Sequence, residues 1–154
     1  MRKKYELKTN DQIRKMRVAG LLTAKALENV QAAIRPGVTT LELDQIAEKT
    51  IRDGGGRPNF QLVPGYYHTI CASINSEVVH GIPSNKVLEA GDLISIDCGA
   101  EVDGWNGDSA FSMVVPGGDA ELAAVLLGEL LADALEVVHL AQDDFDAMQH
   151  VLTG

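Results

Sequence analysis

Two aspartates, Asp97 and Asp108, have the residue type and the spacing to bind a cation. They lie on either side of a turn signal, Asp103-Gly104, and strand-forming residues alternate along 93–113, so this segment is predicted to be a β-hairpin. In a hairpin with an even number of loop residues and no bulge, the numbers of two directly paired residues add to an odd total. The numbers of Asp97 and Asp108 also add to an odd total. Both carboxylates are therefore predicted to project from one face. Neighbouring carboxylates repel each other, and a hard divalent cation between them removes that repulsion.

The other residues of the hairpin agree with this arrangement. Small side chains flank the aspartates and leave room beside them: Ser95, Gly99, Ala110 and Ser112. The opposite face is apolar and is predicted to face the core: Ile94, Ile96, Cys98, Phe111, Met113 and Val115. From the spacing alone, two solvated acids on an exposed sheet face remain the alternative to a metal site.

A histidine on a constrained loop is the second candidate for chemistry. His80 directly precedes 81–83 (Gly-Ile-Pro), and loops that leave a strand are a common place for catalytic groups. A surface histidine or a hydrogen-bonded core histidine is the alternative. Cys71 and Cys98 fall on predicted strands, where small buried side chains without a nucleophilic role are expected. Nothing in the sequence specifies a role for His68.

Two helices are predicted before the hairpin, and each begins with a capping box. Thr9 opens the first helix, which ends at 35–37, and Thr39 opens the second, which ends at the glycines 54–56. Apolar residues recur at helical spacing along both segments. A strand is predicted over 69–74, between the second helix and the hairpin.

The rest of the chain completes an α+β unit. It contains a loop around Pro58, a short strand or loop edge over 78–80, and a final helix over about 121–151. Helices that flank an antiparallel sheet are expected to cover it. We divide the chain into an α+β domain, residues 1–118, and an acidic, Leu- and Ala-rich helical tail of uncertain origin, residues 119–154.

Composition and charge indicate a globular domain and divide the chain at the same place. The 154 residues are 45% hydrophobic and 23% charged, and no apolar run reaches the length of about 18 residues that crosses a membrane. Residues 1–118 hold all 13 Lys and Arg against 14 Asp and Glu, whereas residues 119–154 hold eight acids and no Lys or Arg. The acidic total argues against a nucleic-acid groove. Two cysteines and the lack of a secretory pattern indicate a reduced, cytoplasmic setting.

The predicted tail helix has an unusual distribution of apolar residues. Leu, Ala and Val occupy nearly every side of it between Leu122 and Leu140. A helix that is apolar all round must be buried or must pair with another surface. We therefore expect self-association through this helix.

Taken together, these residues resemble the amino-terminal half of a bacterial-type methionine aminopeptidase. The likeness covers about residues 5–118. It depends on the Asn-x-x-Val-x-His-Gly-Ile-Pro pattern from Asn75 to Pro83 and on the two aspartates with ten residues between them. The resemblance implies half of a pita-bread (creatinase/aminopeptidase) fold. It also implies two divalent metal ions, for which Co, Mn, Fe and Zn are the candidates.

The resemblance also implies a role for each candidate residue. Asp97 would bind one metal through both carboxylate oxygens, Asp108 would bridge both metals, and His80 would contact the substrate and stabilise the transition state. Tyr66 and Cys71 would line the pocket for the methionine side chain. The expected reaction is metal-dependent removal of the N-terminal methionine from nascent proteins. We expect it in the cytoplasm, away from membranes and in association with the ribosome.

The chain departs from the family after Gly118. The family takes its remaining ligands, one His and two Glu, from its second half, and the segment 137–140 (Val-Val-His-Leu) does not replace the family's His-Gly-x-Gly segment. We therefore expect an incomplete metal site and a frameshift or truncation after Gly118. The alternative function is a catalytically inactive half-fold that acts as a binding or assembly module.

Overall fold

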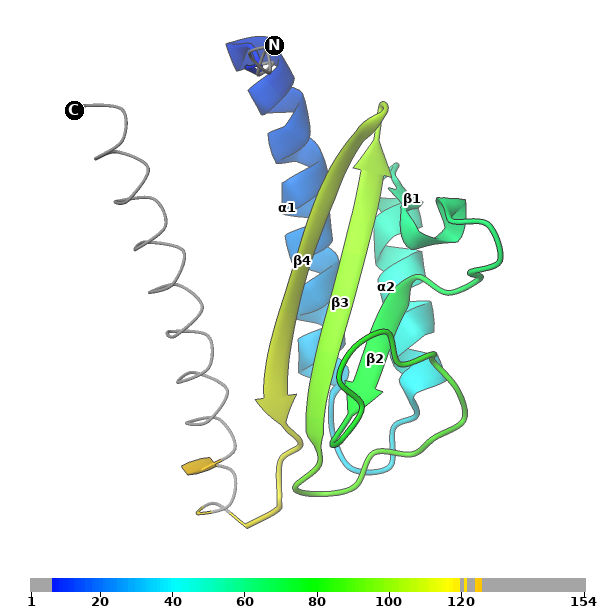
Figure 1. Ribbon diagram of the computed structural model, residues 1–154, viewed down its shortest axis with the longest axis vertical. Helices are drawn as coiled ribbons and strands as arrows, with labels where there is room; N and C mark the ends of the chain where they lie inside the picture. Colours follow the sequence, from blue (N-terminus) through cyan, green and yellow to red (C-terminus); the bar gives the residue numbers. More distant parts are fainter. Residues whose placement is uncertain (1–6, 120, 122–123, 126–154) are drawn as a thin grey trace, which may run out of the picture.

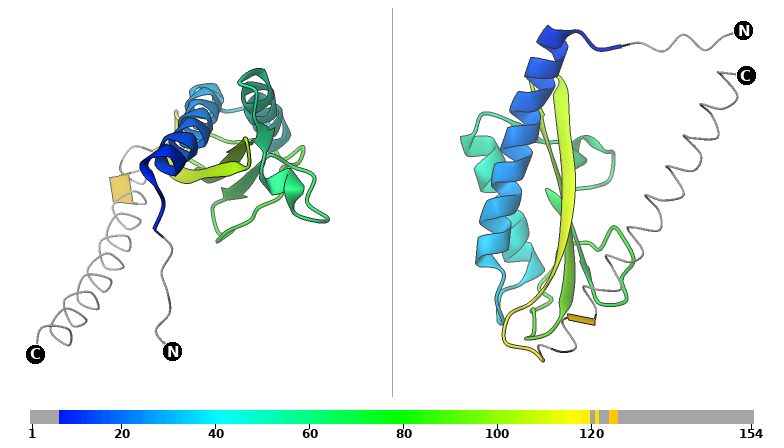
Figure 2. Two further views of the ribbon diagram at one scale, coloured as in Figure 1. Left: turned by 90° about the horizontal axis from the view of Figure 1, so that it is seen from above. Right: turned by 90° about the vertical axis from the view of Figure 1, so that its left-hand side faces the viewer.

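A computed structural model describes residues 7–119, 121 and 124–125 of the chain. Two helices come first, α1 over Asn10–Ala33 and α2 over Thr40–Asp53. They are joined by a short loop and lie side by side (Figures 1 and 2). Every strand follows them in the sequence, so the helices and the sheet are built from separate parts of the chain.

Four strands and one short helix follow within the described residues. A two-residue strand, β1 (Arg57–Pro58), precedes the 3₁₀ helix η1 (Phe60–Leu62). Three longer strands follow: β2 (Ile70–Ile74), β3 (Leu93–Val102) and β4 (Trp105–Val114). The strand predicted over 69–74 and the predicted hairpin are therefore confirmed.

Both helices begin with the capping boxes that the sequence predicted. The hydroxyl of Thr9 accepts a hydrogen bond from the Gln12 N–H at 3.3 Å, and the Gln12 side chain accepts one from the Thr9 N–H at 2.8 Å. Thr39 and Glu42 repeat this exchange at 3.2 and 2.8 Å at the start of α2. These bonds satisfy N–H groups that the first turn of a helix leaves free. Gly54 caps the end of α2, as expected.

The turn between β3 and β4 fixes the hairpin. Asp103 and Gly104 both have positive φ, 51° and 82°, which is the type I′ geometry that joins antiparallel strands through two residues. The ten residues of β3 pair with the ten residues of β4 without a bulge. The numbers of the paired residues therefore add to an odd total, as the prediction required.

The strand β3 lies at the centre of an antiparallel sheet. β4 pairs along one side of it, while β1 and β2 pair with successive parts of its other side. Both helices lie on one face of this sheet (Figure 2), and the core lies between the two layers. Its largest fully buried residues include Val30, Leu43, Ile51, Ile70, Ile94 and Ile96.

The two faces of the hairpin differ as the alternation of its residues predicted. On the helix side, Ile94, Ile96 and Cys98 are completely buried. Phe111 and Met113 are partly buried and pack against the same core. Neither α1 nor α2 covers the opposite face, which carries the aspartates.

The strand β1 was not predicted, because the sequence around Pro58 indicated only a loop. Pro58 pairs with Ala100 and Arg57 with Glu101, at the edge of the sheet, where a residue without an N–H is tolerated. The Arg57 Nε donates to the Glu101 carboxylate at 2.6 Å, and Glu101 is buried. This contact joins residues 44 positions apart in the sequence, so no local sequence pattern predicts it.

Two other predictions concern a loop segment and the helical tail. Residues 78–80, predicted as a short strand or a loop edge, form a loop. The helix predicted over about 121–151 lies almost entirely outside the described residues, as does the self-association expected of it. Within the described part of the chain, neither helix combines the length and the hydropathy required to span a membrane.

Gly107 allows the backbones of β4 and α1 to come close together. A Cβ atom at this position would lie 2.6 Å from the Gly20 Cα and from the Ala19 carbonyl carbon. Since backbone cannot move aside cheaply, we expect Gly107→Ala to lower the free energy of unfolding by about 1–3 kcal/mol. Urea denaturation followed by circular dichroism measures this change.

Gly20→Ala is the matched control for this experiment. Nothing lies within 4 Å of a Cβ at Gly20, and alanine is the better helix former. This control should therefore raise the free energy of unfolding by about 0.5–1 kcal/mol. Equal urea midpoints for wild type and Gly107→Ala would contradict the close approach of α1 and β4.

Candidate metal centre and side-chain pocket

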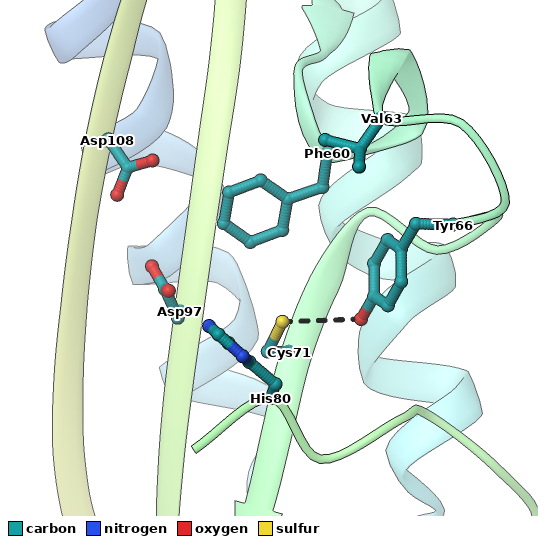
Figure 3. A pocket seen from close by; sticks show the side chains of 7 residues that line it. All are labelled: Phe60, Val63, Tyr66, Cys71, His80, Asp97 and Asp108. Atoms are coloured by element: carbon teal, nitrogen blue, oxygen red, sulfur yellow. Dashed lines mark hydrogen bonds between the residues drawn. The ribbon is translucent and has the colours of Figure 1, made fainter.

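The register of the hairpin places Asp97 and Asp108 side by side. Asp97 pairs with Ala110, and Asp108 pairs with Gly99, two positions further along β3, so both carboxylates project from the same face. Figure 3 shows the two side chains pointing toward one cavity. The shared face predicted from the residue numbers is confirmed, and metal binding by this pair stays a prediction.

The two carboxyl groups influence each other electrostatically. Burial raises the pKa of Asp97 above its usual range, and the negative charge of Asp108 raises it further. A hydrogen bond between the two groups also favours the protonated form of Asp97. Among the residues that the structure describes, no Lys or Arg forms an ion pair with either aspartate. A bound cation would supply the missing positive charge.

The donor set fits part of the ligand shell of a divalent cation. Asp97 and Asp108 offer hard oxygen ligands on a rigid hairpin, which suits Mg, Mn, Fe or Co. Across the described residues, no group of three or more His, Cys, Asp and Glu side chains is placed to hold a metal. The remaining coordination positions therefore need water or ligands from elsewhere.

His80 lines the same cavity as the aspartates. Its φ of 59° is in the left-handed region, which is uncommon for residues other than glycine. The next residue fixes the loop against β2, because the Gly81 N–H donates to the Ser73 hydroxyl at 3.0 Å and the Gly81 carbonyl accepts from the Ala72 N–H at 2.8 Å. The imidazole consequently points toward Asp97 (Figure 3).

The cavity extends from the aspartates to an apolar wall and has a volume of about 470 Å³. Phe60, Val63, Tyr66 and Cys71 form this wall. Cys71 is the register partner of Asp97 across β2 and β3, which connects the wall to the carboxylates. The Tyr66 hydroxyl lies 3.3 Å from the Cys71 sulfur. An aromatic, aliphatic and thiol surface suits a soft, apolar side chain.

Neither cysteine is arranged as a nucleophile. Burial raises the pKa of Cys71, although its hydrogen bond with Tyr66 acts in the opposite direction. Burial also raises the pKa of Cys98 to about 12. Both cysteines are buried, as the sequence predicted. Cys71 forms part of the cavity wall, and Cys98 packs in the core.

Four residues at or near the cavity were not predicted from the sequence: Phe60, Val63, Asp44 and His68. Phe60 and Val63 belong to an irregular segment, where no periodic pattern shows which side chains point inward. Asp44 carried a signal in the sequence, because this acid directly follows the core residue Leu43. In the structure it is only 4% exposed. His68 is identified by its contact with Asp44, 24 positions away, and by its ring contact with Tyr66.

The comparison with protein families decides the ancestry of this site. The model for metallopeptidase family M24 matches residues 14–149. The chain belongs to this family. Metallopeptidases cleave peptide bonds with the help of divalent metal ions, which agrees with the paired aspartates. The matched range includes most of the segment after residue 118, whose separate origin stays a prediction.

Methionine aminopeptidases of several bacteria are similar to the chain in sequence. Methionine aminopeptidase 1 of Mycobacterium tuberculosis is 54% identical over 101 residues, which are 65% of this chain and 38% of that protein. The methionine aminopeptidase of Clostridium acetobutylicum is 36% identical over 140 residues, which are 90% of this chain and 51% of that protein. The chain thus spans about half or less of the length of these curated relatives.

A solved structure gives the same result for the fold. The crystal structure of methionine aminopeptidase from Thermotoga maritima superposes with a TM-score of 0.73 and 35% identity. The superposition covers 77% of this chain and 48% of that one. The predicted α+β architecture, half of a pita-bread fold with helices covering an antiparallel sheet, is confirmed.

The paired aspartates predict that the chain binds a divalent metal ion through these two side chains. Asp97→Asn and Asp108→Asn should each weaken binding of Mn²⁺ by about ten-fold or more, because each variant removes a charged oxygen ligand. Isothermal titration with MnCl₂ measures the dissociation constants. Asp103→Asn is the matched control, since it removes one acid from the hairpin turn, where asparagine tolerates the positive φ. An equal loss of affinity in all three variants would contradict the assignment.

The repulsion between the aspartates also predicts a gain in stability when one of them is neutralised without metal. The pKa of Asp97 is higher in the folded state, so the stability linked to its proton is complete at low pH and is lost as the pH rises through that pKa. At pH 7 Asp108→Asn should therefore raise the urea midpoint of the metal-free chain.

The size of this gain should depend on pH in a defined direction. It should shrink as the pH falls through the pKa of Asp97, because a protonated Asp97 is not repelled by Asp108. Urea titrations at several pH values in the presence of a chelator give the midpoints. A midpoint of Asp108→Asn that stays at or below that of wild type at pH 7 would show that the repulsion is negligible.

Proposed function

We propose that this chain takes part in metal-dependent removal of the N-terminal methionine from nascent polypeptides. One observation carries the proposal: a single cavity joins an apolar, thiol-containing wall to two carboxylates and a histidine. The wall suits a methionine side chain, and the carboxylates suit the cation that a metallopeptidase requires. Similarity to methionine aminopeptidases of several bacteria supports the same reaction.

The apolar wall at one end of the cavity and the aspartates at the other would orient the substrate. The methionine side chain would lie against Phe60, Tyr66 and Cys71, and the first peptide bond would then lie over Asp97 and Asp108. When a divalent cation is bound there, it supplies Lewis-acid activation of water and of the scissile carbonyl. The imidazole of His80 would donate a hydrogen bond to the substrate beside the scissile bond and stabilise the negative charge that develops.

The proposal assigns two parts to the chain. Residues 1–118 form the amino-terminal half of the catalytic domain, and residues 119–154 form an acidic, Leu- and Ala-rich tail. Within the first part, Asp97 and Asp108 would hold the divalent cations, for which Co, Mn, Fe and Zn are the candidates. The expected place of action is the cytoplasm, in association with the ribosome, where new N-terminal methionines arise.

A non-catalytic binding module is the second candidate function. The observation in its favour is that two carboxylates alone leave most of the coordination positions of two cations unfilled among the described residues. In this case the open sheet face would bind a partner, or a second copy of the chain through the apolar tail. Such a module would take up metal weakly and would release no methionine.

A peptide-release assay separates these two functions. We expect the full chain with Mn²⁺ or Co²⁺ to release methionine from Met-Ala-Ser, and Asp97→Ala to reduce the rate by about a hundred-fold or more because the cation site is lost. Chromatography of free methionine measures the rate. Asp103→Asn should retain the wild-type rate.

Each possible result of the assay has one interpretation. Release that persists unchanged in Asp97→Ala belongs to a contaminating peptidase and contradicts the proposed site. No release by wild type at high protein concentration, together with measurable Mn²⁺ binding, would favour the binding module.

A further inference from the structure

A buried carboxyl group that does not line the cavity holds the segment that forms the cavity wall. Asp44 belongs to α2 and is 4% exposed. One of its oxygens accepts hydrogen bonds from the Thr69 and Ile70 N–H groups at 2.7 and 3.0 Å. The other lies 3.2 Å from the Nδ1 of His68. Three consecutive residues are therefore attached to one side chain of the helix layer.

Two of these three residues in turn hold Tyr66. The ring of His68 meets the ring of Tyr66 edge-on, with 5.9 Å between the centroids and 70° between the planes. The Tyr66 hydroxyl donates to the Ile70 carbonyl at 2.7 Å. Asp44 thus binds both groups that fix Tyr66, one at its ring and one at its hydroxyl.

The position of Tyr66 determines the shape of the wall. Phe60 packs edge-on against Tyr66, with 6.3 Å between the ring centroids. The Tyr66 hydroxyl also lies 3.3 Å from the Cys71 sulfur and limits access to it. If Tyr66 moved, the space between Phe60 and Cys71 would open, although the aspartates on β3 and β4 would keep their places.

We propose that His68, anchored by Asp44, is a positioning residue that holds Tyr66 in place and thereby sets which side chain the cavity accepts. The proposal rests on the proposed function for the identity of that side chain, methionine. His68 is suited to this role because its ring contacts Tyr66 while its Nδ1 is fixed by a buried partner. Its side chain is 25% exposed, so its replacement should leave the core intact.

Alkylation of the two cysteines tests this proposal without any need for turnover. The full chain is treated with iodoacetamide, and modification of Cys71 and Cys98 is followed separately by peptide mass spectrometry. His68→Ala should raise the rate at Cys71 by about five-fold, the factor that corresponds to the loss of one edge-on ring contact. The rate at Cys98, which lies in the core and is completely buried, should not change.

Two further variants make this measurement specific. Tyr67→Ala is the matched control, because it changes the preceding residue, which is 83% exposed and takes no part in these contacts. His68→Phe keeps a ring against Tyr66 and should restore part of the protection of Cys71. A selective increase at Cys71 in His68→Ala with partial rescue by His68→Phe supports the proposal. Equal increases at both cysteines, or no change at Cys71, would overturn it.

A kinetic measurement connects this role to the substrate. Where wild type releases methionine, His68→Ala should raise the KM for Met-Ala-Ser by about five-fold and leave kcat within about two-fold, since the wall changes and the aspartates do not. A fall in kcat with unchanged KM would overturn the positioning role alone. Absence of turnover in wild type would overturn the proposed function, whereas the alkylation result would still decide the role of His68.

Discussion

The site depends on the pairing of β3 with β4, because this pairing decides which side chains share a face. Ten residues of each strand pair without a bulge across a two-residue turn. That register sends Ile94 and Ile96 into the core and sends Asp97 and Asp108 to the opposite face. The hydrophobic core and the candidate metal centre are therefore two results of the same constraint. A change that shifted the register would lose both together.

The aspartate face is electrostatically unfavourable without a ligand. Burial and the neighbouring charge raise the pKa of Asp97, and no Lys or Arg among the described residues forms an ion pair with either acid. Structures keep such repulsion where function requires it, since a packed or neutral pair would fold more easily. The paired carboxylates thus cost stability, which the buried contacts on the helix side of the same hairpin offset.

Local sequence patterns predicted the parts of the structure that local physics determines. The capping boxes at Thr9 and Thr39 and the turn at 103–104 depend on neighbouring residues, so they could be identified from the sequence. The even number of loop residues in the hairpin then predicted that Asp97 and Asp108 share a face. The metal-binding roles predicted for these acids came from resemblance to a family, since spacing alone left a structural alternative open.

The parts that could not be predicted arise from contacts between distant segments. β1 is held by the pair of Arg57 and Glu101, 44 residues apart, and no periodic pattern precedes it. Phe60 lies in an irregular segment, whose inward side is determined by the fold as a whole. The contact of His68 with Asp44 spans 24 residues and joins a loop to a helix. Sequence reasoning identified the two aspartates, together with Tyr66 and Cys71 of the wall. It missed Phe60 and Val63 and the contact between Asp44 and His68.

The two-residue turn at Asp103 and Gly104 also limits how this hairpin can change during evolution. An insertion or deletion of one residue between the aspartates would invert the face of every later position on β4, so that Asp108 would point into the core and Phe111 toward solvent. Changes of two residues would preserve both faces. We therefore expect length variation at this tip among homologous hairpins to occur in even steps, or together with a compensating bulge.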